Sequence, residues 1–166
     1  KAVISNYDLL KDFTERFNLP YRHIAAEALS REAHEQLLIS AISNYAPDYI
    51  VLARYMRILT PGFVQHYKDR IINIHHSFLP AFIGAHPYRQ AYERGVKIIG
   101  ATAHFVNNNL DEGPIICQNV IPVDHSQNAA EMARAGRGIE KMVLAQALKL
   151  VLEDKVMLSG NKTVIF

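Results

Sequence analysis

The chain has 166 residues, of which 49% are hydrophobic and 20% charged, and its formal net charge is +2. This composition is typical of one globular domain, and the small net charge without a basic run excludes nucleic acid or an anionic membrane as an expected partner. No apolar stretch is long enough to cross a bilayer, and the single cysteine, Cys117, excludes an internal disulfide and a CxxC site, so we expect a cytoplasmic protein.

The first half of the chain alternates short apolar runs with helical patterns. Apolar residues at helical spacing predict a helix over residues 8–18, and Ser30 is the expected N-cap of a second helix. The pattern predicts strands over 2–5, 21–25, 49–53 and 71–77, and helices over 8–18, 31–46 and from Thr60-Pro61 onward.

The second half begins with a long loop over 78–87, and a helix from Tyr88 that ends at Gly95 follows it. Two strands then flank a polar loop of hairpin type, and a long amphipathic helix and a closing hairpin complete the chain. The apolar face expected for this helix holds Ile139, Met142, Val143, Leu150 and Val151. The predicted ranges are strands over 97–107 and 113–123, the loop over 107–112, the helix over 127–155 and the closing hairpin over 156–166.

Strands that alternate with helices predict an α/β domain of three layers, with a mainly parallel sheet flanked by helices and antiparallel strands late in the chain. In such sheets, binding groups collect in loops at the carboxyl ends of the strands. Three polar clusters follow predicted strands, at residues 54–59, 73–77 and 107–112. We therefore expect the three clusters to form one site.

The stretch "NIHHSFLP", residues 73–80, ends a strand that is otherwise apolar. Asn73 and His75 point to the same face of a strand, because side chains alternate between faces. An amide can donate a hydrogen bond to a developing oxyanion, an imidazole can donate a proton, and a carboxylate such as Asp111 can hold a water or take its proton. These groups indicate acyl chemistry without a covalent nucleophile. A strand that simply ends at the surface would also explain the polar residues.

Other interpretations of these residues remain open. Four histidines could bind a metal, although no HExxH or HxxxH spacing supports this: His75, His76, His86 and His104. Ser77 could be a nucleophile, but no G-x-S-x-G turn surrounds it. Cys117 lies in an apolar run and is favoured as a structural residue. Asp111 lies among turn-forming residues and could serve the hairpin alone.

Three motifs in order, "NIHHSFLP", "IIGATAHFVNNNLDEGPIICQ" and "RAGRGIEK", resemble the folate-dependent formyltransferase superfamily across essentially the whole chain. The doubled histidine and "QAYERGVKIIGATAH" are similar to its formyltetrahydrofolate deformylase branch. The resemblance implies a hydrolase of one-carbon metabolism. It would convert 10-formyltetrahydrofolate to tetrahydrofolate and formate, which feeds purine synthesis, with no metal or prosthetic group, as a homo-oligomer.

The resemblance also implies roles for particular residues. The catalytic residues would be Asn73, His75 and Asp111. The substrate-binding residues around the pterin ring would be Arg57, Ile58, Leu59, Asn107, Asn108, Asn109 and Leu110.

The resemblance further implies that residues 1–166 are a formyltransferase-like catalytic domain that lacks its first strand and helix and an ACT-type regulatory domain. We therefore expect either a fragment or an incomplete record of a longer chain, with a sheet that lacks a central strand. Gly138 stands where the family tends to have an Asp. Two alternatives to hydrolysis stay open: formyl transfer to glycinamide ribonucleotide or another amine, and a non-catalytic folate-binding module. His76, where the transferases tend to have Pro, favours hydrolysis.

Overall fold

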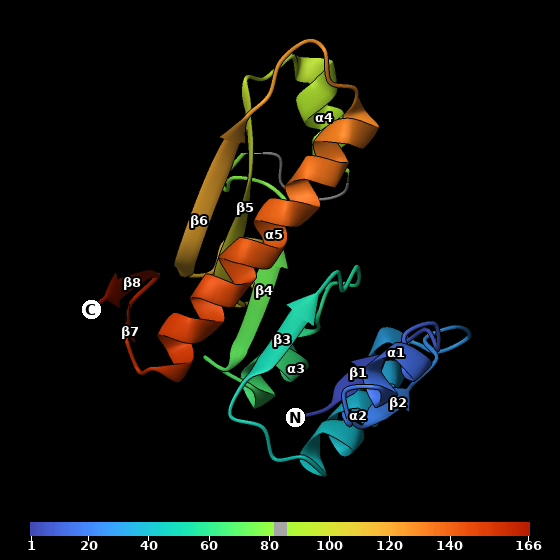
Figure 1. The fold of residues 1–166 in the computed structure, drawn as a ribbon. Coiled ribbons are helices and arrows are strands. Elements are labelled where there is room, and N and C mark those ends of the chain that lie inside the picture. The colour runs from blue at the N-terminus through green and yellow to red at the C-terminus, as the bar shows by residue number, and fades with distance from the viewer. Residues whose placement is uncertain (82–85) are drawn as a thin grey trace. The chain divides into compact units, whose positions relative to one another are not determined.

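The predicted order of strands and helices is found in a computed structural model, which describes residues 1–81 and 86–166 (Figure 1). The chain divides into two compact units. The first holds residues 1–49 and 59–66, and the second holds residues 50–58 and 67–166. Residues 82–85 of the predicted 78–87 loop lie outside the described residues.

In the first unit, a two-stranded parallel sheet is accompanied by three helices. Strand β1 (Val3–Ser5) pairs with β2 (Tyr21–His23), and the helices are α1 (Lys11–Glu15), α2 (Arg31–Ser43) and α3 (Pro61–His66). Ser30 is the N-cap of α2, as predicted, because its hydroxyl accepts a hydrogen bond from the Ala33 amide at 3.1 Å. The buried carboxylate of Glu35 accepts hydrogen bonds from the amide and the hydroxyl of Thr60, which lies just before α3.

Helix α1 is shorter than the predicted 8–18 segment. No side chain caps its start at Leu10, and the chain leaves the helix before Asn18, whose φ of 54° is left-handed. With so short a helix, the four apolar residues of the pattern remain more than half exposed: Leu9, Leu10, Phe13 and Phe17. The helical spacing therefore predicted a helix correctly, but the predicted segment, 8–18, is longer than the observed helix, Lys11–Glu15.

The second unit is built on a four-stranded sheet in the order β3-β4-β5-β6. Strands β3 (Ile50–Ala53) and β4 (Ile71–His75) are parallel, whereas β5 (Ile98–Phe105) and β6 (Ile115–Pro122) continue the sheet in antiparallel fashion. Strands β7 (Val156–Ser159) and β8 (Lys162–Ile165) form the predicted closing hairpin. The predicted fold class, parallel strands flanked by helices with late antiparallel strands, is confirmed.

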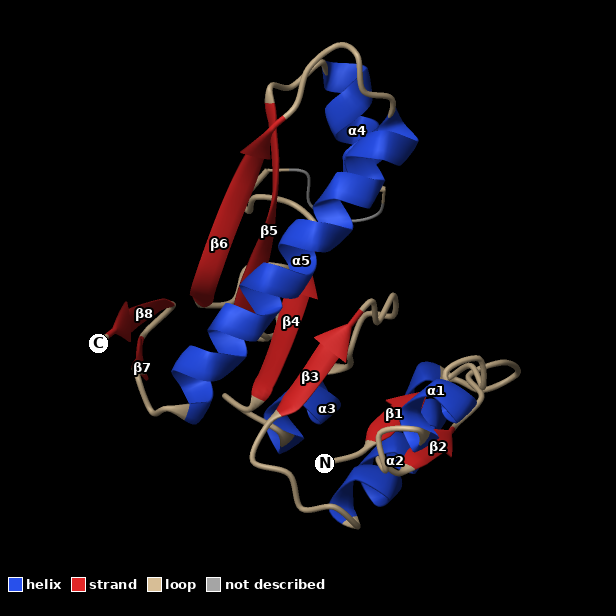
Figure 2. Cartoon of the chain, viewed as in Figure 1, coloured by secondary structure: helices blue, strands red, loops and turns tan. Residues whose placement is uncertain are grey.

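Helix α5 (Ala129–Leu152) packs along this sheet against β4, β5 and β6, and the shorter α4 (Pro87–Arg94) packs on α5 (Figure 2). Asn128 and Glu131 form a capping box at the start of α5. The predicted apolar face is buried at Ile139, Val143 and Val151, but Met142 is 57% exposed. None of the described helices is long and apolar enough to cross a membrane.

Gly138 lies on the exposed side of α5, and a Cβ added there would meet no other part of the described structure within 4 Å. A glycine inside a helix loses more backbone entropy on folding than an alanine does. We expect Gly138→Ala to raise the free energy of unfolding by about 1 kcal/mol. Urea denaturation followed by circular dichroism measures this change, and an unchanged or lower stability would contradict it.

Candidate active site

Asn73 and His75 lie on one face of β4 and are opposed by residues of β5. The register pairs Asn73 with His104 and His75 with Thr102. His75, Thr102 and His104 are buried, and Asn73 is half-buried. These polar side chains therefore do not fray into water at the end of a strand. They gather on a covered face of the sheet.

The carboxylate of Asp111 lies against this face. Its Oδ2 is 3.3 Å from Nδ1 of His75, its Oδ1 is 3.8 Å from Nε2 of His104, and its side chain is only 8% exposed. The structure thus brings Asn73, His75 and Asp111 together, as the sequence predicted. A buried carboxylate next to an imidazole can accept a hydrogen bond from that ring and so orient it.

Of the three predicted clusters, the structure brings 73–77 and 107–112 together, but strand ends do not produce this meeting. Strand β5 runs antiparallel to β4, so Phe105 at its carboxyl end pairs with Ile72 near the start of β4. Asp111 reaches His75 because the 107–112 loop folds back over the sheet. Asp111 has a left-handed backbone in this loop, with φ of 58°, and the pairing of β5 with β6 shifts register between Ala103 and His104, shortly before the loop.

His104 is a site residue whose role the sequence prediction missed. Its Nδ1 is 2.9 Å from the carbonyl oxygen of Phe105. A carbonyl oxygen can only accept, so Nδ1 carries the ring proton. Burial lowers the pKa of His104, although the bond to Phe105 and the charge of Asp111 oppose this shift. The neutral ring therefore presents a lone pair at Nε2.

That lone pair accepts a hydrogen bond from Nδ2 of Asn73 at 3.3 Å. The bond fixes which end of the Asn73 amide carries the N–H groups and leaves its second N–H for another acceptor. In the sequence, the only indication of this role was a histidine within the apolar run "ATAHFV". That it lies opposite Asn73 follows from the strand register and could not be deduced from the sequence.

The 107–112 loop is held by its own side chains and by the closing hairpin. Oδ1 of Asn107 accepts from the Asn109 amide at 3.0 Å, and Nδ2 of Asn109 donates to Oε2 of Glu112 at 3.0 Å. Asn161, in the turn between β7 and β8, donates from Nδ2 to the Glu112 carbonyl at 2.9 Å. These bonds fix the backbone that carries Asp111.

The predicted substrate-binding residues fall in two places. Arg57 and Ile58 follow β3 in the second unit, where Ile58 is 52% exposed, and Leu59 belongs to the first unit. Asn107 to Leu110 form the first part of the loop that carries Asp111, and Asn108 and Leu110 are exposed there. Their role in binding stays a prediction.

The open alternatives gain no support from the geometry. The Ser77 hydroxyl donates to the carbonyl oxygen of Ala81 at 2.6 Å, not to a histidine. Burial raises the pKa of the Cys117 thiol, which disfavours the nucleophilic thiolate. In the described part of the chain, no three His, Cys, Asp or Glu side chains are grouped so as to hold a metal ion.

Gly113 allows the loop to fold back, because a Cβ at this position would collide with the carbonyl oxygen of Phe105. We expect Gly113→Ala to displace the loop and separate Asp111 from His75. The free energy of unfolding should fall by about 1–3 kcal/mol, the usual cost of overpacking. Chemical denaturation gives the stability, and the NMR signals of His75 and His104 report the local change. A variant with the parental stability and unchanged histidine signals would contradict this account of the turn.

Comparison with known proteins identifies similar sequences and structures. A formyl transferase family model matches residues 1–148. The chain is 62% identical over 164 residues to a formyltetrahydrofolate deformylase from Haemophilus influenzae and 54% identical over 165 residues to one from Bacillus subtilis. These matches cover 99% of this chain but only 59% and 55% of those relatives, so the chain spans somewhat more than half of their length.

Two solved structures extend the comparison. A formyltetrahydrofolate deformylase from Pseudomonas syringae matches with a TM-score of 0.96 and 47% identity, covering 99% of this chain and 55% of that one. A glycinamide ribonucleotide transformylase from Symbiobacterium toebii matches with a TM-score of 0.94 and 34% identity, covering 99% and 80%.

Proposed function

Because this chain belongs to the formyl transferase family, we propose that it hydrolyses 10-formyltetrahydrofolate to tetrahydrofolate and formate. The reaction would balance one-carbon pools and supply formate for purine synthesis. The observation that carries the proposal is the buried set of Asn73, His75 and Asp111 on one face of the sheet. Identity of 45–62% to proteins named as deformylases supports hydrolysis in particular.

In this proposal, Asn73 and His75 act on the formyl oxygen. The N–H of Asn73 that is not bound to His104 donates to the oxygen as negative charge develops on it, and the protonated ring of His75 adds a second donor. A single donor of this kind is worth about 10²–10³ in rate. Asn73 is held by His104 of β5 and His75 by Asp111 of the 107–112 loop, so both groups need little rearrangement when the charge appears.

Asp111 would position the attacking water and take up its proton. The oxygen of water forms a bond to the formyl carbon, and collapse of the intermediate breaks the bond from that carbon to N10 of the folate. N10 must gain a proton as it leaves, and we assign the donor role to His75, whose other nitrogen faces Asp111. Formate and tetrahydrofolate are the products.

The remaining parts of the proposal follow from the family. Residues 1–166 would be part of a formyltransferase-like catalytic domain, with no prosthetic group. The residues proposed to bind the pterin are Arg57, Ile58 and Leu59 and the loop residues Asn107, Asn108, Asn109 and Leu110.

Formyl transfer to glycinamide ribonucleotide is a second candidate, because the transformylase from Symbiobacterium toebii has a similar structure. The test is to incubate the protein, in the longest form that its gene encodes, with 10-formyltetrahydrofolate, with and without glycinamide ribonucleotide. Hydrolysis predicts formate without an amine acceptor. Formylated amine without free formate would support transfer instead, and folate binding without either product would support a non-catalytic module.

A further inference from the structure

Behind the candidate site, three aromatic rings follow one another from β4 to α4. The ring of His76 stacks on the ring of His75, with centroids 5.4 Å apart and planes 29° apart. The ring of Tyr88 lies next to the ring of His76, with centroids 6.2 Å apart and an angle of 35° between the ring planes. The ring of His75 therefore contacts two groups: the carboxylate of Asp111, and the ring of His76, which the proposed mechanism does not use.

Tyr88 is anchored to helix α5 at two points. Its hydroxyl donates to Oε1 of Glu140 at 2.7 Å. A Cβ at Gly136, one turn earlier on the same helix, would collide with the phenol oxygen and ring. The missing side chain at Gly136 therefore leaves a notch in α5 that the end of the phenol occupies. Burial and the bond to Glu140 raise the pKa of Tyr88, so the phenol keeps its proton and remains a donor.

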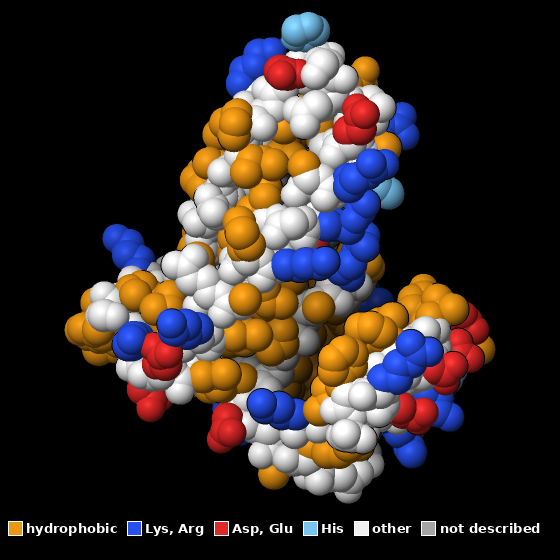
Figure 3. Space-filling model, in the orientation of Figure 1, with side chains coloured by type: hydrophobic (Ala, Val, Ile, Leu, Met, Phe, Trp, Pro, Cys, Tyr) orange, Lys and Arg blue, Asp and Glu red, His pale blue; other side chains and the backbone are white. Residues whose placement is uncertain are grey.

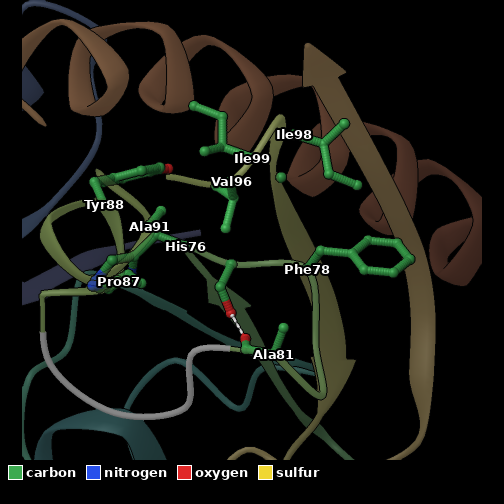
Figure 4. Close-up of a pocket in the computed structure, with 11 residues that line it drawn as sticks. His76, Phe78, Ala81, Pro87, Tyr88, Ala91, Val96, Ile98 and Ile99 are labelled. Carbon is green, nitrogen blue, oxygen red and sulfur yellow. Dashed lines mark hydrogen bonds between the residues drawn. The ribbon is translucent and has the colours of Figure 1, made fainter. Parts of the chain in front are cut away.

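An unfilled space lies next to this stack. His76 and Tyr88 line a small cavity of about 100 Å³. Its other walls are mostly apolar and include Phe78, Ala91 and Val96 (Figure 4). Because the cavity offers room beside both rings, packing alone does not hold them in one place. The bond to Glu140 and the notch at Gly136 supply the missing constraint.

The surroundings of the His76 ring favour its neutral form, and burial is the main cause. Burial lowers the pKa of His76, and the neighbouring ring of His75 and the guanidinium of Arg54 lower it further, whereas the carboxylates of Glu140 and Asp111 oppose the shift. A neutral His76 ring adds no positive charge next to the ring of His75.

We propose that Tyr88 is a positioning residue, which is seated in the notch at Gly136, bound to Glu140, and holds His76 against the ring of His75. The placement of the rings is independent of the reaction. Its effect on formate release rests on the proposed function.

The first test is NMR on three variants of the same chain. Gly136→Ala fills the notch, Tyr88→Phe removes only the hydroxyl, and Gly138→Ala adds the same methyl group where nothing lies within 4 Å. We expect Gly136→Ala and Tyr88→Phe to weaken the nuclear Overhauser effect between the rings of His76 and Tyr88. Both variants should also shift the imidazole signals of His75 and His76. Gly138→Ala should leave them unchanged. Unchanged imidazole signals in Tyr88→Phe would overturn the proposal, even if Gly136→Ala did not fold.

The second test distinguishes the hydrogen bond between Tyr88 and Glu140 from the charge of Glu140. It also measures whether the placement of the three rings affects formate release. Glu140→Gln keeps an acceptor oxygen for the phenol, whereas Glu140→Ala removes it. In the formate assay, kcat should fall roughly 10–100-fold in Glu140→Ala and Tyr88→Phe, the cost of a small misplacement, with KM changed less than about twofold. Glu140→Gln should retain most of kcat.

Equal kcat in Glu140→Ala and Glu140→Gln would overturn the role of the hydrogen bond. A parental enzyme that releases no formate would instead count against the proposed function, and the NMR result would still decide the placement of the rings.

Discussion

Asp111→Asn is expected to lower kcat for formate release by about 10²–10⁴-fold, the usual contribution of a general acid or base. The amide has nearly the same shape as the carboxylate and can still accept a hydrogen bond from His75. It carries no negative charge and cannot take a proton from water. The loss should therefore appear in kcat, measured as formate produced at saturating 10-formyltetrahydrofolate, while a folate analogue still binds.

Asp154→Asn is the matched control for this change. Asp154 also has a left-handed backbone, with φ of 55°, but it is exposed at the end of α5, far along the sequence from the candidate site. Its variant should keep the parental kcat. Activity within threefold of the parent in Asp111→Asn would remove the carboxylate from the mechanism, and equal losses in both variants would indicate a general effect of the substitution.

His75→Gln is expected to cause a loss of similar size, about 10²–10⁴-fold in kcat. Glutamine can donate a neutral hydrogen bond to the formyl oxygen, but it cannot transfer a proton to N10. Without that proton the folate nitrogen leaves as an unstable anion, so the intermediate reverts instead of releasing formate. Single-turnover experiments, in which enzyme exceeds substrate, measure this step directly.

The control here is His125→Gln, because His125 is exposed in the segment between β6 and α5. It should show parental kinetics. If His75→Gln kept its single-turnover rate, the proton for N10 would have to come from another group.

Most of the fold was predictable from local sequence patterns. Ser30 capped its helix, Gly95 ended α4 in a left-handed conformation, and the closing hairpin formed where expected. Alternation along one strand was enough to place Asn73 and His75 on the same face. These features depend on residues close together in the chain, which is why sequence reasoning reaches them.

The parts that were missed depend on contacts between distant residues. From the sequence, His104 was considered only as a possible metal ligand, and its place beside Asn73 became known from the strand register. The two glycines of "RAGRG" look alike in the sequence, but Gly136 is buried against Tyr88 and Gly138 is open to solvent. The exposed apolar residues of α1 show the same limit, since helical spacing does not reveal what covers a face.

The central claim is that Asn73, His75 and Asp111 act as one unit on a single formyl carbonyl. The most direct measurement is kcat for the double variant His75→Gln/Asp111→Asn, compared with the two single variants under the same conditions. Residues that work together in one step give strongly non-additive losses. The account predicts that the double variant is no more than a few-fold slower than the slower single variant. A loss equal to the product of the two single losses would show that the two groups act independently and would contradict the account.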